Sequence, residues 1–146
     1  MHSKGSAEAG WYVTAEPVRG FMLDGRFLAI KNPKSGSVLK VDLETPRFAL
    51  DNVTGDISVD FDYIFYGVLR TKVKVFYQVA GETPQLLGEL TKDPNRNRTH
   101  FSKKIENAVF AGKEWLQLTF NYSGAVNEYL CIDNLSVVPE LSLIHI

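Results

Sequence analysis

The chain has 146 residues, of which 45% are hydrophobic and 23% charged, with 16 Lys and Arg against 17 Asp and Glu. This length favours one domain that folds without disulfides or metal, and the single cysteine, Cys131, excludes an internal disulfide. A formal net charge of −1 argues against nucleic-acid binding, and no apolar run reaches the roughly 18 residues that a membrane-spanning helix needs.

The first nine residues are small and polar and lack the apolar core of a signal peptide, so we expect residues 1–9 to be disordered. Between residues 10 and 140, apolar and polar side chains alternate, which is typical of half-buried strands. Turn sequences such as Asp24-Gly25 and Asn32-Pro33 separate the alternating runs. About ten short strands at this spacing predict an all-β sandwich or barrel over residues 10–140.

Two long alternating runs occupy the middle of the chain. The run from Ile57 to Phe65 places apolar residues on one face and Ser58, Asp60 and Asp62 on the other. The run from Val73 to Val79 repeats this pattern, with Lys72, Lys74 and Gln78 on its polar face. Because residues 67–70 form a short connection, we predict that the two runs pair as a hairpin.

The C-terminal third contains the sole helical candidate, Lys103 to Phe110, which is equally compatible with a strand followed by a loop. Beyond it, the runs Trp115 to Tyr122 and Leu130 to Val137 look like the closing hairpin of a jelly-roll β-sandwich. Asp133 lies inside the last of these runs, where a carboxylate is unfavourable unless it is paired or bound.

The last six residues, Leu141-Ser142-Leu143-Ile144-His145-Ile146, match the translation of CTG TCT CTT ATA CAC ATC. That string resembles the transposase mosaic end used in preparing sequencing libraries. We therefore expect residues 141–146 to be a non-native tail, and the natural protein to continue past Glu140. A native apolar tail is the alternative.

Several short motifs occur in a recognisable order. They are Gly10-Trp11, Leu43-Glu44-Thr45-Pro46, Val59-Asp60-Phe61-Asp62-Tyr63-Ile64-Phe65-Tyr66-Gly67 and Ile132-Asp133-Asn134-Leu135-Ser136-Val137. From Trp11 to Pro139 this order resembles the MAM and cleaved-adhesin (choice-of-anchor J) families, and the lack of the MAM cysteines favours the cleaved-adhesin branch. The resemblance implies an antiparallel jelly-roll β-sandwich of two sheets in an extracellular or cell-surface protein.

The same resemblance implies a role for Asp133, because the corresponding aspartate can help to hold a structural cation or tie down the N-terminal segment. A Ca²⁺ ion takes roughly six to eight oxygen ligands, so a second residue such as Asp24 or Glu16 would have to contribute if the first and last strands pair. The alternative is a structural aspartate held by hydrogen bonds.

Two groups of side chains are candidates for ligand binding. Asp60 and Asp62 lie two apart, so both point to the same side, where they could bind sugar hydroxyls or form a solvated face opposite Lys72 and Lys74. Ile64, Tyr66 and Phe76 fall on the polar side of their strands. They are either covered by other parts of the chain or form a platform on which a sugar or partner could stack.

These features predict a non-catalytic extracellular adhesion or carbohydrate-binding module of a larger surface protein. Its predicted ligand-binding residues are Tyr66, Phe76, Asp60 and Asp62, and its partner is a glycan or a surface protein. One alternative is a spacer or assembly domain that contacts neighbouring domains. Another is a small jelly-roll hydrolase that uses Asp60 and Asp62, although no set of acid, base and oxyanion donors is evident.

Overall fold

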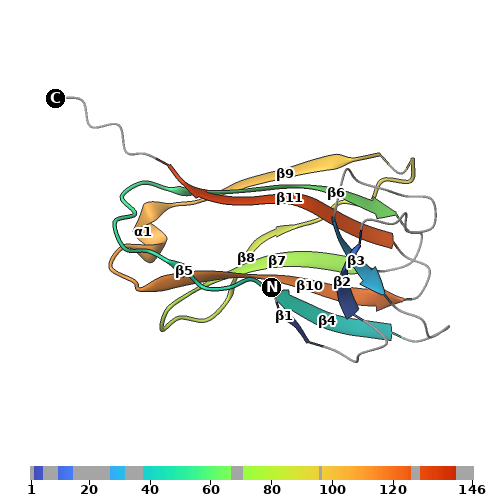
Figure 1. Cartoon of the computed structure of the whole chain (residues 1–146), viewed down its shortest axis with the longest axis horizontal. Coiled ribbons are helices and arrows are strands. Elements are labelled where there is room, and N and C mark those ends of the chain that lie inside the picture. The colour runs from blue at the N-terminus through green and yellow to red at the C-terminus, as the bar shows by residue number, and fades with distance from the viewer. Residues whose placement is uncertain are drawn as a thin grey trace.

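The computed structural model describes residues 2–4, 10–14, 27–31, 38–66, 71–95, 97–125 and 129–140 (Figure 1). Within these ranges the chain forms strands and one short helix. In chain order they are β1 His2–Lys4, β2 Gly10–Thr14, β3 Phe27–Lys31, β4 Val38–Glu44, β5 Phe48–Ala49, β6 Ile57–Tyr66, β7 Lys72–Val79, β8 Gln85–Glu89, β9 Thr99–Ile105, α1 Asn107–Phe110, β10 Trp115–Ala125 and β11 Tyr129–Pro139.

The strands form two sheets that lie face to face as two layers in Figure 1. Sheet A has the order β1-β4-β10-β7-β8, with β5 also pairing with β10, and sheet B has the order β2-β3-β11-β6-β9. Every pairing is antiparallel. The prediction of an all-β sandwich of two antiparallel sheets is therefore confirmed.

Both predicted hairpins are wrong. Strand β6 lies in sheet B between β11 and β9, whereas β7 lies in sheet A between β10 and β8. Strands β10 and β11 are likewise divided between the two sheets. Alternation shows which side of a strand is buried but not which strand lies beside it, and in this fold the connections cross from one sheet to the other. Asp60 and Asp62 consequently do not face Lys72 and Lys74.

Two further predictions concern the helical candidate and the N-terminal segment. The segment Lys103 to Phe110 divides between the end of β9 and helix α1. In the N-terminal segment expected to be disordered, His2–Lys4 form β1, which pairs with β4 through backbone hydrogen bonds that do not depend on apolar side chains.

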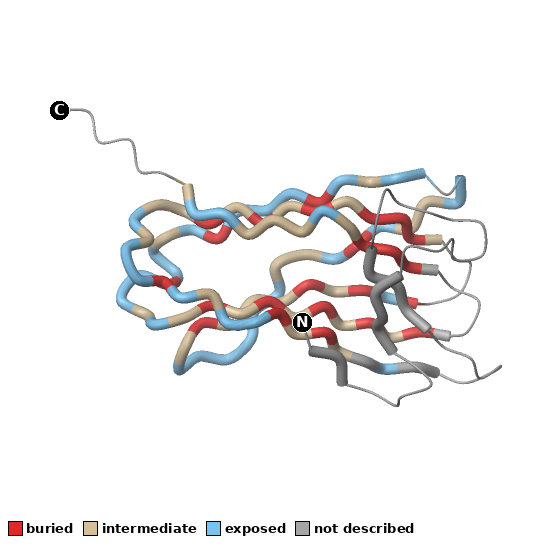
Figure 2. The backbone as a smooth tube through the Cα atoms, in the orientation of Figure 1, coloured by how far each residue is buried: buried red, intermediate tan, exposed pale blue. Residues whose placement is uncertain are grey.

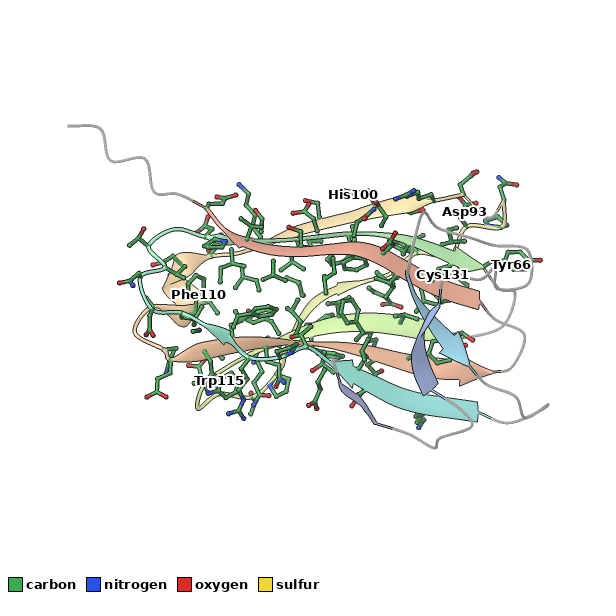
Figure 3. All side chains as sticks on the ribbon, in the orientation of Figure 1. Tyr66, Asp93, His100, Phe110, Trp115 and Cys131 are labelled. Carbon is green, nitrogen blue, oxygen red and sulfur yellow. The ribbon has the colours of Figure 1, made fainter. Side chains whose placement is uncertain are left out.

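The core lies between the sheets and is built around the ring of Phe61. This ring stacks on Phe101 of the same sheet, with centroids 4.5 Å apart, and forms a T-shaped pair with Phe120 from sheet A, with centroids 5.4 Å apart. Figure 2 shows buried residues recurring along the facing strands, as expected when alternate side chains point inward. At one end of the sandwich, Phe110 of α1 is buried against this core (Figure 3).

A step at Thr45 and Pro46 separates β4 from β5 along the same partner, β10. Thr45 N–H donates to the carbonyl of Leu118 at 3.0 Å, and the Thr45 hydroxyl accepts from the N–H of Leu118 at 3.1 Å. Thr45 is buried, with 2% of its surface exposed. The hydroxyl therefore replaces a backbone acceptor at the point where proline interrupts the ladder.

A bulge divides β11. Its pairing with β6 shifts between Asp133 and Ser136, and Asn134 has a positive φ of 56°. Before the bulge Leu130 and Ile132 belong to the core, and after it Leu135 and Val137 pack against the core. Because of the extra residue, the side chains that face the core have even residue numbers before the bulge and odd residue numbers after it.

Candidate functional site

The four predicted ligand-binding residues do not share a face. Asp60, Asp62 and Tyr66 point away from the core on β6 of sheet B, whereas Phe76 points away from the core on β7 of sheet A. Packed sheets lie about 10 Å apart, and the outer faces point in opposite directions. Figure 3 shows this separation through His100 and Trp115, which lie on opposite sides of the sandwich. One small ligand cannot contact both groups.

On the outer face of sheet B, polar side chains bind one another. Asp62 accepts hydrogen bonds from Arg98 at 2.8 Å and from Asn134 at 2.9 Å, and it contacts His100 Nδ1 at 2.8 Å. The other ring nitrogen of His100 lies 3.2 Å from Asp60. We call Asp60, Asp62, Arg98, His100 and Asn134 the sheet B cluster.

The pKa values of two residues in the sheet B cluster follow from these contacts. The hydrogen bonds from Asn134, His100 and Arg98 lower the pKa of the Asp62 carboxyl well below its usual range. The hydrogen bonds to Asp62 and Asp60 raise the pKa of His100 above its ordinary value of 6.5. Both ring nitrogens face a carboxylate, an arrangement that favours the imidazolium because only that form donates from both nitrogens.

Two other residues identified in the sequence, Ile64 and Tyr66, also lie on β6 of sheet B. Ile64 is 6% exposed and therefore covered, as is its cross-strand neighbour Cys131, which is fully buried. Burial raises the pKa of the Cys131 thiol to about 12. Tyr66 is half-buried at the end of β6.

The predicted metal ligand Asp133 is half-buried next to Asp62, its cross-strand partner on β6. The second predicted ligand, Asp24, lies outside the described residues. Within the part of the chain that the structure describes, no group of three or more His, Cys, Asp or Glu side chains is arranged to hold a metal ion. In the same part, no helix is long and apolar enough to cross a membrane.

The outer face of sheet A is hollowed. The hollow has a volume of about 260 Å³ and is lined by Asp42, Glu44, Phe76, Gln78, Pro84, Thr119 and Asn121. These residues come from β4, β10 and β7 and from the turn before β8, so the hollow runs across the strands. Its volume is slightly below the roughly 300–1,000 Å³ of typical small-molecule sites. We call it the sheet A hollow.

Cross-strand pairing places the lining residues in rows. One row joins Asp42, Asn121 and Lys74, and the next joins Glu44, Thr119 and Phe76. Beside Phe76 lies Leu86 of β8, which is 54% exposed. A third row contains Gln117 and Gln78. An aromatic ring with an exposed apolar neighbour thus lies among amides, a hydroxyl and carboxylates.

Two features bound this face along β10. In the direction of β5, the guanidinium carbon of Arg47 lies 4.0 Å from the ring centroid of Trp115, a cation–π contact on a half-buried tryptophan. In the opposite direction, Ser123 pairs with Lys40 on one side and Lys72 on the other, and both lysines are exposed. The hollow lies between the cation–π pair and the two lysines.

Most residues that line the sheet A hollow were not predicted. Phe76 was, because its aromatic side chain stands in a polar register. Asp42, Thr119 and Asn121 also stand in polar registers of alternating runs, and this is the signal that could have identified them. Their convergence depends on β4, β10 and β7 being neighbours, which alternation does not show.

No family model matches this sequence, and no curated protein matches it. Among solved structures, the fold is similar to TmCBM61 in complex with β-1,4-galactotriose, with a TM-score of 0.65, 15% identity and coverage of 95% of this chain and 88% of that chain. It is also similar to Family 16 Carbohydrate Binding Module-2, with a TM-score of 0.53, 14% identity and coverage of 90% and 85%.

A third similar structure is the CBM22-1 xylan-binding domain from Paenibacillus barcinonensis Xyn10C, with a TM-score of 0.52, 10% identity and coverage of 92% and 83%. At such low identities the likeness shows the fold alone. The predicted jelly-roll is therefore confirmed, and the chain has the jelly-roll β-sandwich fold found in carbohydrate-binding modules.

Proposed function

We propose that this domain is a non-catalytic carbohydrate-binding module and that a glycan binds in the sheet A hollow. One observation carries the proposal: the hollow combines the ring of Phe76 with a surrounding set of hydrogen-bonding side chains. A sugar ring presents an apolar C–H face and a rim of hydroxyls, and this combination is complementary to both. The fold shared with solved carbohydrate-binding modules supports the same proposal.

The arrangement of carboxylates in the hollow favours binding over catalysis. Asp42 and Glu44 stand two residues apart on one strand and point to the same side. Glycosidases place an acid and a second carboxylate on either side of the bond that is cleaved. Two carboxylates side by side can accept hydrogen bonds from hydroxyls but do not flank a bond in this way.

The setting of the module is also part of the proposal. The resemblance to the MAM and cleaved-adhesin families supports an extracellular or cell-surface location within a larger modular protein, with residues 10–140 as the module. It supports a surface glycan, or a surface protein, as the partner. We also propose that residues 141–146 are a non-native tail.

The test is a glycan-array and polysaccharide binding screen of the full chain, followed by two variants. Phe76→Ala removes the ring in the hollow and should weaken binding by about tenfold or more, the usual effect of losing a central aromatic contact. Tyr66→Ala is the matched control, since it removes a half-buried aromatic residue from the other sheet, and binding should be unchanged. Melting temperatures of both variants establish that they fold.

The other outcomes separate the alternatives. Loss of binding in Tyr66→Ala with none in Phe76→Ala would place the ligand on sheet B, with Asp60 and Asp62. A folded protein that binds no glycan would favour the spacer function. The screen is run with calcium and with a chelator, and unchanged binding and melting would remove the predicted Ca²⁺ at Asp133 and Asp24.

A further inference from the structure

We propose that Arg47 is a second ligand contact on the outer face of sheet A, so that the domain binds linear glycan chains long enough to reach from the sheet A hollow to Arg47. This inference rests on the proposed function, because it concerns the same glycan. The position of Arg47, the aromatic ring that holds it and its distance from Phe76 support it.

Trp115, on which Arg47 rests, stands on the same side of β10 as the lining residues Thr119 and Asn121. The even-numbered residues from Leu116 to Tyr122 are fully buried, so the odd-numbered residues of this strand point away from the core. Figure 3 shows Trp115 on the outer side of sheet A. The hollow and the Arg47–Trp115 pair therefore lie on one face of the sandwich.

The step between β4 and β5 places Arg47 over Trp115. After the step, the ladder with β10 resumes at β5 and pairs Ala49 with Trp115. Ala49 has only a methyl group to set beside the ring, and the guanidinium carbon of Arg47 lies 4.0 Å from the ring centroid. The exposed guanidinium is thus held in place before any ligand arrives, which lowers the entropy lost on binding.

The chemistry of Arg47 suits a sugar. A guanidinium carries five N–H donors and no acceptor, and the oxygen of a sugar hydroxyl accepts hydrogen bonds. Within the described ranges, the contact with Trp115 is the interaction that Arg47 makes, and its N–H groups can therefore donate to a ligand.

The distance to the hollow sets the length of the ligand. Thr119, which pairs with Phe76, and Trp115 lie four residues apart on β10. At the usual rise per residue, the row of Phe76 and the row of Trp115 are about 14 Å apart. One sugar ring is too short to span this distance, so only a chain of several sugars contacts both Phe76 and Arg47. Gln78 and Gln117 pair in the row between, where neutral amides can bond the hydroxyls of the intervening sugars.

The opposite end of β10 offers a weaker contact. Ser123 lies as far from Thr119 as Trp115 does, and it pairs with Lys40 and Lys72. Both lysines are exposed, and no ring of the described residues holds either of them. A free lysine side chain loses more entropy on binding than an arginine already held on a ring. We therefore expect the chain to extend toward Arg47.

Charge does not determine the length of the ligand. Asp42 and Glu44 line the hollow, but they also face strand β1, which pairs Lys4 with Asp42 and His2 with Glu44. Acidic and basic residues are thus neighbours at this side of the hollow. Neutral oligomers are the suitable probes, because their affinity depends on hydrogen bonds and stacking rather than on these charges.

The test is calorimetry of the full chain with linear β-1,4 oligomers of glucose, mannose, xylose and galactose, from two to six sugars long. In the series that binds, affinity should rise with length by about tenfold or more. It should then level off, because a chain that already reaches Arg47 gains no contact from further sugars.

Arg47→Ala removes the second contact. It should weaken binding of the longest oligomers by about three- to tenfold, the usual value of one or two hydrogen bonds, and leave the shortest oligomers that bind unaffected. Lys72→Ala is the matched control, because it removes an exposed cation at the same distance from Thr119 in the opposite direction, and affinity should stay as in the wild type at every length. Phe76→Ala should weaken binding at every length. Melting temperatures establish that each variant folds.

Trp115→Leu tests the role of the ring as the support of Arg47. It should reproduce the loss for long oligomers, and the double variant with Arg47→Ala should lose no more than either single variant, since the ring acts through the guanidinium. A further loss in the double variant would contradict this role.

Three results would overturn the inference while the proposed function stands. They are an affinity that does not rise with length, a loss in Arg47→Ala that is absent or equal at all lengths, and a loss in Lys72→Ala that is confined to long oligomers. The last would mean that the chain extends in the opposite direction. If neither these oligomers nor the glycans of the array bind to the folded protein, the proposed function fails and this inference fails with it.

Discussion

Two pairs of carboxylates with the same spacing differ in what surrounds them. Asp42 and Glu44 on β4, and Asp60 and Asp62 on β6, each stand two residues apart and point away from the core. On β6 the neighbouring strands supply Arg98, His100 and Asn134, and Asp62 interacts with all three. On β4 one neighbouring strand, β10, supplies Thr119 and Asn121, of which Asn121 binds Asp42, and the surface is hollow. The other neighbour, β1, pairs His2 with Glu44 and Lys4 with Asp42.

The comparison teaches that the spacing of charged residues in a strand does not determine their role. The sheet B cluster uses its hydrogen-bonding capacity internally, which makes it a structural feature of that face. The sheet A hollow instead places carboxylates and amides around an aromatic ring in a depression of the surface. The residues across the strand, which are distant in sequence, decide between these outcomes.

The largest expected effect is on stability and concerns Thr45, at the step between β4 and β5 in sheet A. Thr45→Val removes the hydroxyl that accepts from the buried N–H of Leu118 and should destabilise the protein by about 1–3 kcal/mol, the usual penalty for an unsatisfied buried donor. Chemical denaturation measures the change. Thr45→Ser keeps the hydroxyl and is the control, so equal losses in both variants would contradict the role given to this hydrogen bond.

A smaller effect separates the two carboxylate pairs. Asp62→Asn should destabilise the protein by about 1 kcal/mol, because it weakens charge-assisted hydrogen bonds that are partly exposed to solvent. Asp42→Asn should change the free energy of unfolding by less, about 0.5 kcal/mol, since the amide oxygen of the new side chain can still accept the one hydrogen bond from Asn121. Equal losses of stability in the two variants would show that the two carboxylates contribute equally to folding, which would contradict the contrast between the two faces.

The smallest expected effect is a pH dependence of the sheet B cluster. The pKa of His100 is raised by Asp62 and Asp60, so its contribution to stability is complete below the ordinary pKa of 6.5 and is lost as the pH rises through the folded-state value. The pKa of Asp62 is lowered, so its contribution is present above the ordinary value of 3.8 and is lost as the pH falls through the folded-state value.

Melting temperatures of the wild type and of His100→Gln test this dependence. The wild type should exceed the variant by more at pH 5.5 than at pH 8.5, because only the protonated ring donates to both carboxylates. A constant gap between the two proteins would show that the charge on His100 does not contribute.

Much of the fold could be predicted because it depends on local patterns. Alternation from Ile57 to Phe65 and from Leu116 to Tyr122 identified two strands and their buried faces. The partners of these strands could not be predicted, because β6 and β10 pair with segments distant in sequence. The predicted hairpins assumed that neighbours in sequence are neighbours in space, and the jelly-roll violates this.

The candidate site was less predictable for the same reason. Phe76 stands out in sequence as an aromatic residue on a polar face, but the rest of the hollow comes from four separate segments. His100 is far from Asp62 in sequence, and only the pairing of β6 with β9 brings the two side chains together. Both surfaces are products of strand order, and a single sequence carries little information about strand order.

The bulge at Asn134 constrains how β11 can change in evolution. Because Asn134 is the extra residue between two halves of opposite parity, deleting it alone would restore strict alternation and leave Leu130, Ile132, Leu135 and Val137 all facing the core. Away from the bulge, insertions and deletions within the strand should be accepted only in pairs, because a shift of one residue turns side chains to the opposite face of the sheet. A search for strict alternation would interpret β11 as two short strands. An alignment of relatives should therefore allow a one-residue gap at Asn134 and keep the alternation of inward and outward residues on each side of it.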